Sequence, residues 1–157
     1  GPGQLSGFLI PDLLDKLANV KRKKIDYIET GNVKTRRDYT DVRDVVRAYS
    51  LLAEAEILNY ETYNICSGKS YSGEEILQLL KEITDTQNIS HKINLNNIRP
   101  NDPKDIYGDY QRIYKDTNWK PAITLEKTLK DCVDSFNVWG SRPEPSQYPL
   151  HGIVGSD

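Results

Sequence analysis

Two arginine-bearing segments contain the side chains best suited to chemistry. Residues 31–44 include Arg36 and Arg37, and residues 98–102 include Arg99. Each arginine sits next to a turn or a helix start. A planar guanidinium group can clamp a diphosphate with paired hydrogen bonds. The two segments therefore indicate a binding site for a phosphorylated ligand.

The same arginines have a simpler interpretation. Arg37 has acidic neighbours and could form a structural ion pair with Asp38 or Asp41. Pairs of this kind are common on protein surfaces and contribute little to stability. Residue type alone favours the ion pair over the ligand contact.

The usual catalytic and metal-binding motifs are missing. No GxGxxG loop follows a strand, there is no Walker loop, HExxH motif or paired CxxC, and no tyrosine has a lysine four residues later. The glycines of residues 1–7 are not preceded by a strand, and Pro2 lacks an amide hydrogen that could contact phosphate. His91 and His151 lie far apart, without nearby ligand partners. The sequence thus predicts no catalytic, cofactor-binding or metal site.

Composition is that of a globular domain. The 157 residues carry 21 basic and 23 acidic side chains, a net charge of −2, and 37% are hydrophobic. This charge argues against a nucleic-acid partner, and no apolar run approaches the roughly 20 residues of a membrane span.

Two cysteines and no signal-peptide pattern favour the cytoplasm. Because methionine is absent, we expect a cleavage product or an isolated piece of a longer protein.

Periodicity predicts alternating strands and helices, and hence an α/β or α+β fold. A capping box at residues 72–75 marks one helix start. After residue 139 the pattern stops, and residues 140–157 carry three prolines, which is typical of a linker, a tag or an added peptide. The expected helices cover residues 8–20, 41–56, 76–83, 109–117 and 125–136, and the expected strands cover 25–29, 36–40, 62–66 and 89–95.

Several short stretches occur in a recognisable order. They are Gly-Pro-Gly-Gln at 1–4, Gly-Phe-Leu-Ile-Pro-Asp at 7–12, Arg-Asp-Tyr-Thr-Asp-Val-Arg-Asp at 37–44, Tyr-Asn-Ile-Cys-Ser-Gly-Lys at 63–69, Arg-Pro-Asn-Asp at 99–102 and Thr-Asn-Trp-Lys-Pro at 117–121. Together they resemble the C-terminal half of extended short-chain dehydrogenases/reductases (SDRs) that act on nucleotide sugars, the NAD-dependent epimerase/dehydratase family. Within it they are most similar to the GDP-4-keto-6-deoxy-D-mannose reductases and GDP-mannose 4,6-dehydratases. Asn118 stands where the family usually has glycine.

This resemblance implies a division of labour. In the family, an N-terminal Rossmann domain holds NADP or NAD and carries the catalytic Ser/Thr, Tyr and Lys. Neither the cofactor loop nor YxxxK occurs in this chain. Residues 1–139 would then be the substrate-binding lobe without its Rossmann core, with no cofactor binding and no turnover of its own. Residues 39–57 would pack on the missing domain, so we expect that domain, or self-association, to cover their apolar face.

The resemblance also suggests site residues. Arg37 is similar to the arginine that contacts the nucleotide diphosphate or its ribose, Arg99 to the second diphosphate arginine, and Asp102 to a residue near the nucleotide. Phe8, Ile10 and Pro11 belong to a segment that lies along the nucleobase. Arg36 could replace Arg37 in a shifted register.

Two classes of function follow. In the first, the chain is the nucleotide-sugar-binding part, for a GDP-sugar in particular, of an oxidoreductase, with a dehydratase (a lyase) or a 4-epimerase as close alternatives. In the second, it is a non-enzymatic α/β scaffold or interaction module that presents residues 140–157.

Overall fold

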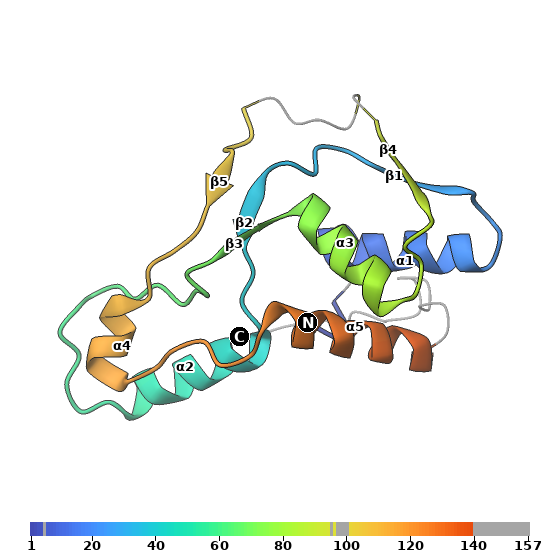
Figure 1. The fold of residues 1–157 in the computed structure, drawn as a ribbon. Helices are drawn as coiled ribbons and strands as arrows, with labels where there is room; N and C mark the ends of the chain where they lie inside the picture. Colours follow the sequence, from blue (N-terminus) through green and yellow to red (C-terminus); the bar gives the residue numbers. More distant parts are fainter. Residues whose placement is uncertain (5, 95, 97–100, 140–157) are drawn as a thin grey trace, which may run out of the picture.

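The computed structural model describes residues 1–4, 6–94, 96 and 101–139. These residues form a mixed α/β arrangement of short strands between longer helices (Figure 1). The elements are, in chain order, α1 (Leu9–Lys21), β1 (Tyr27–Thr30), β2 (Arg36–Asp38), α2 (Val42–Glu54), β3 (Ser70–Ser72), α3 (Gly73–Ile83), β4 (Ser90–Ile93), β5 (Asp105–Ile106), α4 (Gln111–Thr117) and α5 (Leu125–Trp139).

The strands of this region form two small sheets. β1 and β4 pair in parallel, with Tyr27 opposite Ser90. β2 is the middle strand of the other sheet, antiparallel to β3 and parallel to β5. β2 forms backbone hydrogen bonds to a strand on each side. These bonds fix the backbone positions from which the side chains of Arg36 to Asp38 project.

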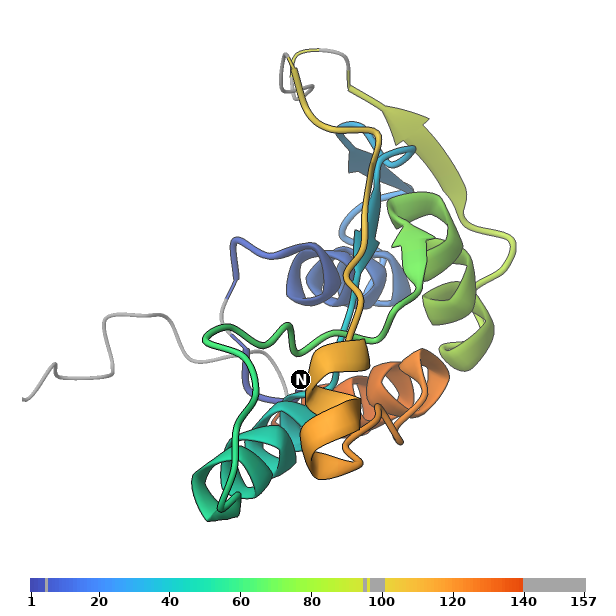
Figure 2. The same cartoon turned by 90° about the vertical axis from the view of Figure 1, so that its left-hand side faces the viewer.

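The larger core lies between α1, α3 and α5. Each helix presents one apolar face, as its sequence spacing predicts, and Ile28 of β1 packs against the same cluster. Figure 2 shows these three helices grouped beside the sheets. The fully buried members include Leu13, Leu17, Leu80 and Leu129.

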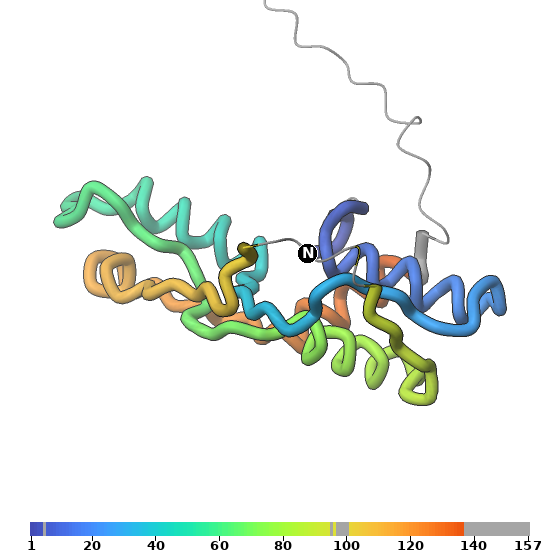
Figure 3. The backbone as a smooth tube through the Cα atoms, turned by 90° about the horizontal axis from the view of Figure 1, so that it is seen from above, coloured from blue at the N-terminus to red at the C-terminus, as the bar shows by residue number. Residues whose placement is uncertain are grey.

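A smaller core joins α2 to α4. It contains Ala48, Ile113 and Trp119, all with 0% exposure. The Trp119 indole Nε1 donates a hydrogen bond to the Asp44 carbonyl at 3.0 Å, so the aromatic ring is buried with its one polar atom satisfied. Seen from above, α2 and α4 lie together at one end of the molecule, and α1, α3 and α5 lie at the other (Figure 3).

One sequence prediction is wrong. Residues 62–66 were expected to form a strand, but they run as irregular chain. The sheets of the described residues contain β1 to β5 alone, so this segment has no neighbouring strand with which its backbone can pair. Within the same part of the chain, no helix is long and apolar enough to cross a bilayer.

Candidate functional site

Strand β2 sorts three consecutive charged residues onto opposite faces. Successive side chains of a strand alternate, so Arg36 and Asp38 share one face and Arg37 occupies the other. The contacts of these residues agree with this arrangement: Arg36 and Arg37 bind different partners, and both side chains stay partly exposed.

Arg37 is held in an oriented position and remains partly open to solvent. Its Nη1 donates to the Arg36 carbonyl at 2.6 Å and to the Pro103 carbonyl at 2.8 Å. Its Nη2 forms an ion pair with the Asp102 carboxylate, and the two side chains are 29% and 28% exposed. The structure thus brings together two predicted site residues that lie far apart in sequence. The ion pair of Arg37 is with Asp102, rather than with Asp38 or Asp41.

Arg36 is used in a different way. Its Nη1 donates to the Glu75 carboxylate at 2.8 Å, its Nε to the Ser70 hydroxyl at 3.2 Å, and its Nη2 to the Ser70 carbonyl at 2.7 Å. Hydrogen bonds from Ser72 lower the pKa of Glu75, although burial opposes this, and Arg36 contributes in the same direction. Arg36 therefore fastens β2 to the start of α3.

Asp38 ties the middle strand to two loops. Its carboxylate accepts hydrogen bonds from the Ser67 amide and the Gly68 amide, each at 2.9 Å, and from the Ser67 hydroxyl at 2.5 Å. A weaker bond comes from the Gly108 amide at 3.3 Å. Sequence reasoning weighed Asp38 as a partner of Arg37 and missed this role, because nothing in the local sequence links Asp38 to residues 67, 68 and 108.

A cavity of about 550 Å³ opens beside the end of β2 and the start of α2. Of the residues expected along a nucleobase, Ile10 lines this cavity, whereas Pro11 is buried in the first turn of α1 and the Phe8 side chain is 58% exposed. Burial raises the pKa of Tyr39 despite nearby Arg37, so its hydroxyl stays protonated at neutral pH. The cavity is lined by Gly1, Pro2, Gly3, Gln4, Ile10, Asp38, Tyr39, Thr40, Asp41, Val42, Leu125 and Thr128.

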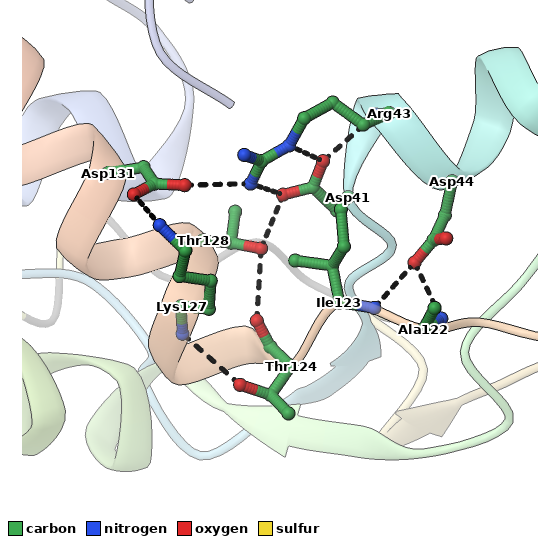
Figure 4. Close-up of polar contacts among 9 residues, drawn as sticks. All are labelled: Asp41, Arg43, Asp44, Ala122, Ile123, Thr124, Lys127, Thr128 and Asp131. Atoms are coloured by element: carbon green, nitrogen blue, oxygen red, sulfur yellow. Dashed lines mark hydrogen bonds and ion pairs between the residues drawn. The ribbon is translucent and has the colours of Figure 1, made fainter.

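A polar network fixes one wall of the cavity (Figure 4). Asp41 caps α2 by accepting from the Arg43 amide at 2.9 Å, and it also accepts from the Thr128 hydroxyl of α5 at 2.6 Å. Arg43 pairs with Asp41 at 2.8 Å and with Asp131 of α5 at 2.9 Å. Hydrogen bonding to Arg43 keeps the pKa of Asp41 far below its usual range, although burial opposes it. This carboxylate is therefore ionised and locks α2 to α5.

The remaining expected features cannot be placed. Arg99 and residues 140–157 lie outside the described residues. Among residues 1–4, 6–94, 96 and 101–139, no group of three or more His, Cys, Asp or Glu side chains could hold a metal ion.

Comparison with known proteins places this geometry in a family. Residues 1–132 match the family described as GDP-mannose 4,6 dehydratase. The chain is 30% identical over 144 residues to the GDP-6-deoxy-D-mannose reductase of Pseudomonas aeruginosa, which covers 90% of this chain and 45% of that relative. The chain thus spans less than half of this relative's length.

Comparison with solved structures also shows that the chain matches part of a longer protein. RMD from Pseudomonas aeruginosa, complexed with NADPH, superposes with a TM-score of 0.78 at 27% identity, over 88% of this chain and 45% of that one. The UDP-glucose 4-epimerase of Thermotoga maritima with UDP-glucose superposes with a TM-score of 0.67 at 27% identity, over 88% and 41%. The fold is therefore a part of the extended SDR fold.

Proposed function

Because the chain belongs to the GDP-mannose 4,6-dehydratase family, we propose that residues 1–139 are the C-terminal, nucleotide-sugar-binding lobe of an NAD(P)-dependent sugar-nucleotide enzyme. The observation that carries this proposal is the position of Arg37. Its guanidinium is anchored by two backbone carbonyls, yet the side chain keeps 29% of its surface exposed. An oriented cation that solvent can reach suits a diphosphate.

The ligand we favour is a GDP-sugar. The family and the Pseudomonas reductase are both named for GDP-sugars, whereas the Thermotoga neighbour holds UDP-glucose. In our proposal Arg37 and Arg99 contact the diphosphate, Asp102 lies near the nucleotide, and Phe8, Ile10 and Pro11 follow the base. Arg36 takes a minor part because Glu75 and Ser70 already engage it. Residues 140–157 are a tail outside this lobe.

The chemistry we assign to the whole protein is reduction of a 4-keto-6-deoxy sugar nucleotide, with 4,6-dehydration or 4-epimerisation as alternatives. NADP or NAD would supply or take the hydride, and a tyrosine would act as general acid. Since the chain has no YxxxK and no cofactor loop, we expect it alone to bind no cofactor and to turn nothing over. Two buried cysteine thiols fit our assignment to the reducing cytoplasm.

The partner we propose for this lobe is the Rossmann half, which would dock on α2. Val42, Val46 and Tyr49 follow one another along one side of this helix and are 50%, 57% and 61% exposed. Ile57, just beyond the helix, is 72% exposed. Large apolar side chains gathered in this way mark a protein-binding surface. In the isolated chain, the same surface would drive self-association.

Calorimetric titration of the chain with GDP, GDP-mannose and UDP tests the binding proposal. We expect GDP to bind more tightly than UDP, and Arg37→Ala to weaken GDP binding about tenfold or more, as loss of a charged hydrogen-bonding partner does. Arg22→Ala, which removes an exposed arginine at the end of α1, is the matched control. Equal binding by wild type and Arg37→Ala would remove Arg37 from the site.

A second experiment tests the expected lack of activity. Oxidation of NADPH by the chain with a keto-sugar nucleotide would refute the predicted inactivity.

A further inference from the structure

We propose that Asp102 competes with the ligand: in the free chain its carboxylate occupies the place on Arg37 that a diphosphate oxygen takes, and it must leave for the diphosphate to bind. This inference rests on the proposed function, because it assumes that Arg37 binds the diphosphate. It adds a built-in competitor to that site.

The first argument is that the two terminal nitrogens of the Arg37 guanidinium have different kinds of partner. Both hydrogens of Nη1 go to backbone carbonyls, those of Arg36 and Pro103. The Nη2 group instead donates to the Asp102 carboxylate. The two carbonyls hold the orientation whether or not Asp102 stays, so release of the carboxylate leaves Nη2 aimed at the vacated place.

The second argument is that Asp102 differs from the structural carboxylates of this chain. Asp38 accepts from two amides and a hydroxyl at 2.9 Å or less, and Asp44 accepts from two amides and an arginine at 2.9 Å or less. In the described part of the chain, the Asp102 carboxylate has Arg37 as its one hydrogen-bonding partner. A carboxylate held by one contact can leave at far smaller cost than one held by three or four.

The third argument concerns charge and exposure. Asp102 and Arg37 are each between a quarter and a third exposed, so water weakens their attraction and can solvate the carboxylate once it leaves. A diphosphate brings more negative charge than one carboxylate and can make paired bonds to the guanidinium. Both anions cannot occupy one face of Arg37, because two like charges would lie in contact. Binding therefore replaces the weaker anion with the stronger.

Inorganic pyrophosphate is the probe that isolates this competition, because it has no ribose or base for Asp102 to contact. Titration of the full chain with pyrophosphate should show tighter binding by Asp102→Asn than by wild type, by about three- to fivefold, the range expected for loss of a partly exposed ion pair. Asp105→Asn is the matched control. It removes the same charge from an exposed position on neighbouring β5, and it should change pyrophosphate binding by less than twofold.

Two further measurements separate the possible failures. Arg37→Ala in the Asp102→Asn background should abolish the gain, which places the pyrophosphate on Arg37. Weaker or unchanged pyrophosphate binding by Asp102→Asn would overturn the competition, even where wild type binds GDP through Arg37 and the proposed function stands. Failure of wild type to bind GDP would instead refute the proposed function. An equal gain in Asp105→Asn would show general charge repulsion and overturn the specific role of Asp102.

Discussion

At the scale of single residues, Asp44 shows how one buried carboxylate joins distant parts of the chain. Asp44 is 1% exposed, and it accepts hydrogen bonds from the Ala122 and Ile123 amides, each at 2.9 Å. Arg47 pairs with it at 2.7 Å and also donates to the Lys120 carbonyl at 2.5 Å. Helix α2 is thereby fixed to the segment that leads into α5.

The pKa of Asp44 predicts how stability depends on pH. Burial raises this pKa, but hydrogen bonds from Arg47 and two amides outweigh it, so the pKa lies below its ordinary value in the folded chain. Below about pH 4 the unfolded chain therefore binds more protons than the folded one, and the free energy of unfolding falls as pH falls. Urea unfolding at pH 7, 5 and 3 should show little change between 7 and 5 and a clear loss at 3.

A substitution checks the source of that loss. Asp44→Asn should lower the free energy of unfolding at pH 7 by about 3 kcal/mol, because the buried carboxylate loses its charge and the single asparagine oxygen can accept either from the two amides, which share Oδ2, or from Arg47, but not from all three. The variant should also lose less stability between pH 5 and pH 3 than wild type does. An identical loss in the variant would assign the acid sensitivity to other carboxylates, such as Asp41.

Asn118 gives a second prediction at this scale. It ends α4 in the left-handed conformation, with φ 57°, and its amide donates to the Tyr114 carbonyl at 2.8 Å. Asparagine and glycine tolerate this conformation better than other residues, so either residue suits the end of α4. Thermal unfolding should show Asn118→Ala destabilised by about 1 kcal/mol and Asn118→Gly unchanged or slightly more stable. Equal loss in both variants would mean that the asparagine side chain matters, rather than the backbone conformation.

At the scale of elements, the start of α3 is set by a capping box. The Ser72 hydroxyl accepts from the Glu75 amide at 3.1 Å, and the Glu75 carboxylate accepts from the Ser72 amide at 2.7 Å. Ser72→Ala should lower the free energy of unfolding by about 1 kcal/mol. Ser6→Ala, at an exposed position outside the helices, is the control in the same chemical denaturation series. A Ser72→Ala loss no greater than that of Ser6→Ala would contradict the role of the cap.

Elements with local signals could be predicted from the sequence. The capping box marked α3, and the apolar spacing marked α1, α2 and α5 to within a few residues. The short strands β3 and β5 were missed because three and two residues carry no periodicity, and pairing with β2 defines them. The prediction of a strand at 62–66 was wrong because a strand also needs a neighbouring strand to pair with, and the local sequence does not show whether one is present.

For the candidate site too, the sequence indicated individual residues but not the contacts between distant ones. The family resemblance selected Arg37 and Asp102, but local sequence could not show that they pair across 65 positions of chain. Sequence proximity also suggested the wrong acidic partners for Arg37: Asp38 lies on the opposite face of the strand, and Asp41 lies beyond the strand, where it caps α2 and pairs with Arg43. Strand alternation and the β2–β5 pairing decide that contact.

At the scale of the whole molecule, two separate cores leave α2 covered on one side only. Its buried side meets α4 and Trp119, while Val42, Val46 and Tyr49 remain exposed. The chain spans under half the length of the relatives that it matches, and in our proposal the Rossmann half would cover this exposed surface. Exposed apolar area of this kind drives association in water.

This open surface predicts concentration-dependent association through α2. Sedimentation velocity of the wild-type chain should show a weight-average coefficient that rises with concentration, and Val46→Lys should reduce that rise by placing a charge in the middle of the contact. Because Val46 is 57% exposed, its replacement should leave the unfolding free energy within about 0.5 kcal/mol of wild type. Gln78→Lys, at an exposed position on α3, adds the same charge elsewhere and should associate as wild type does. A wild-type chain that stays monomeric at high concentration, or equal effects of the two lysines, would show that the α2 face does not drive association.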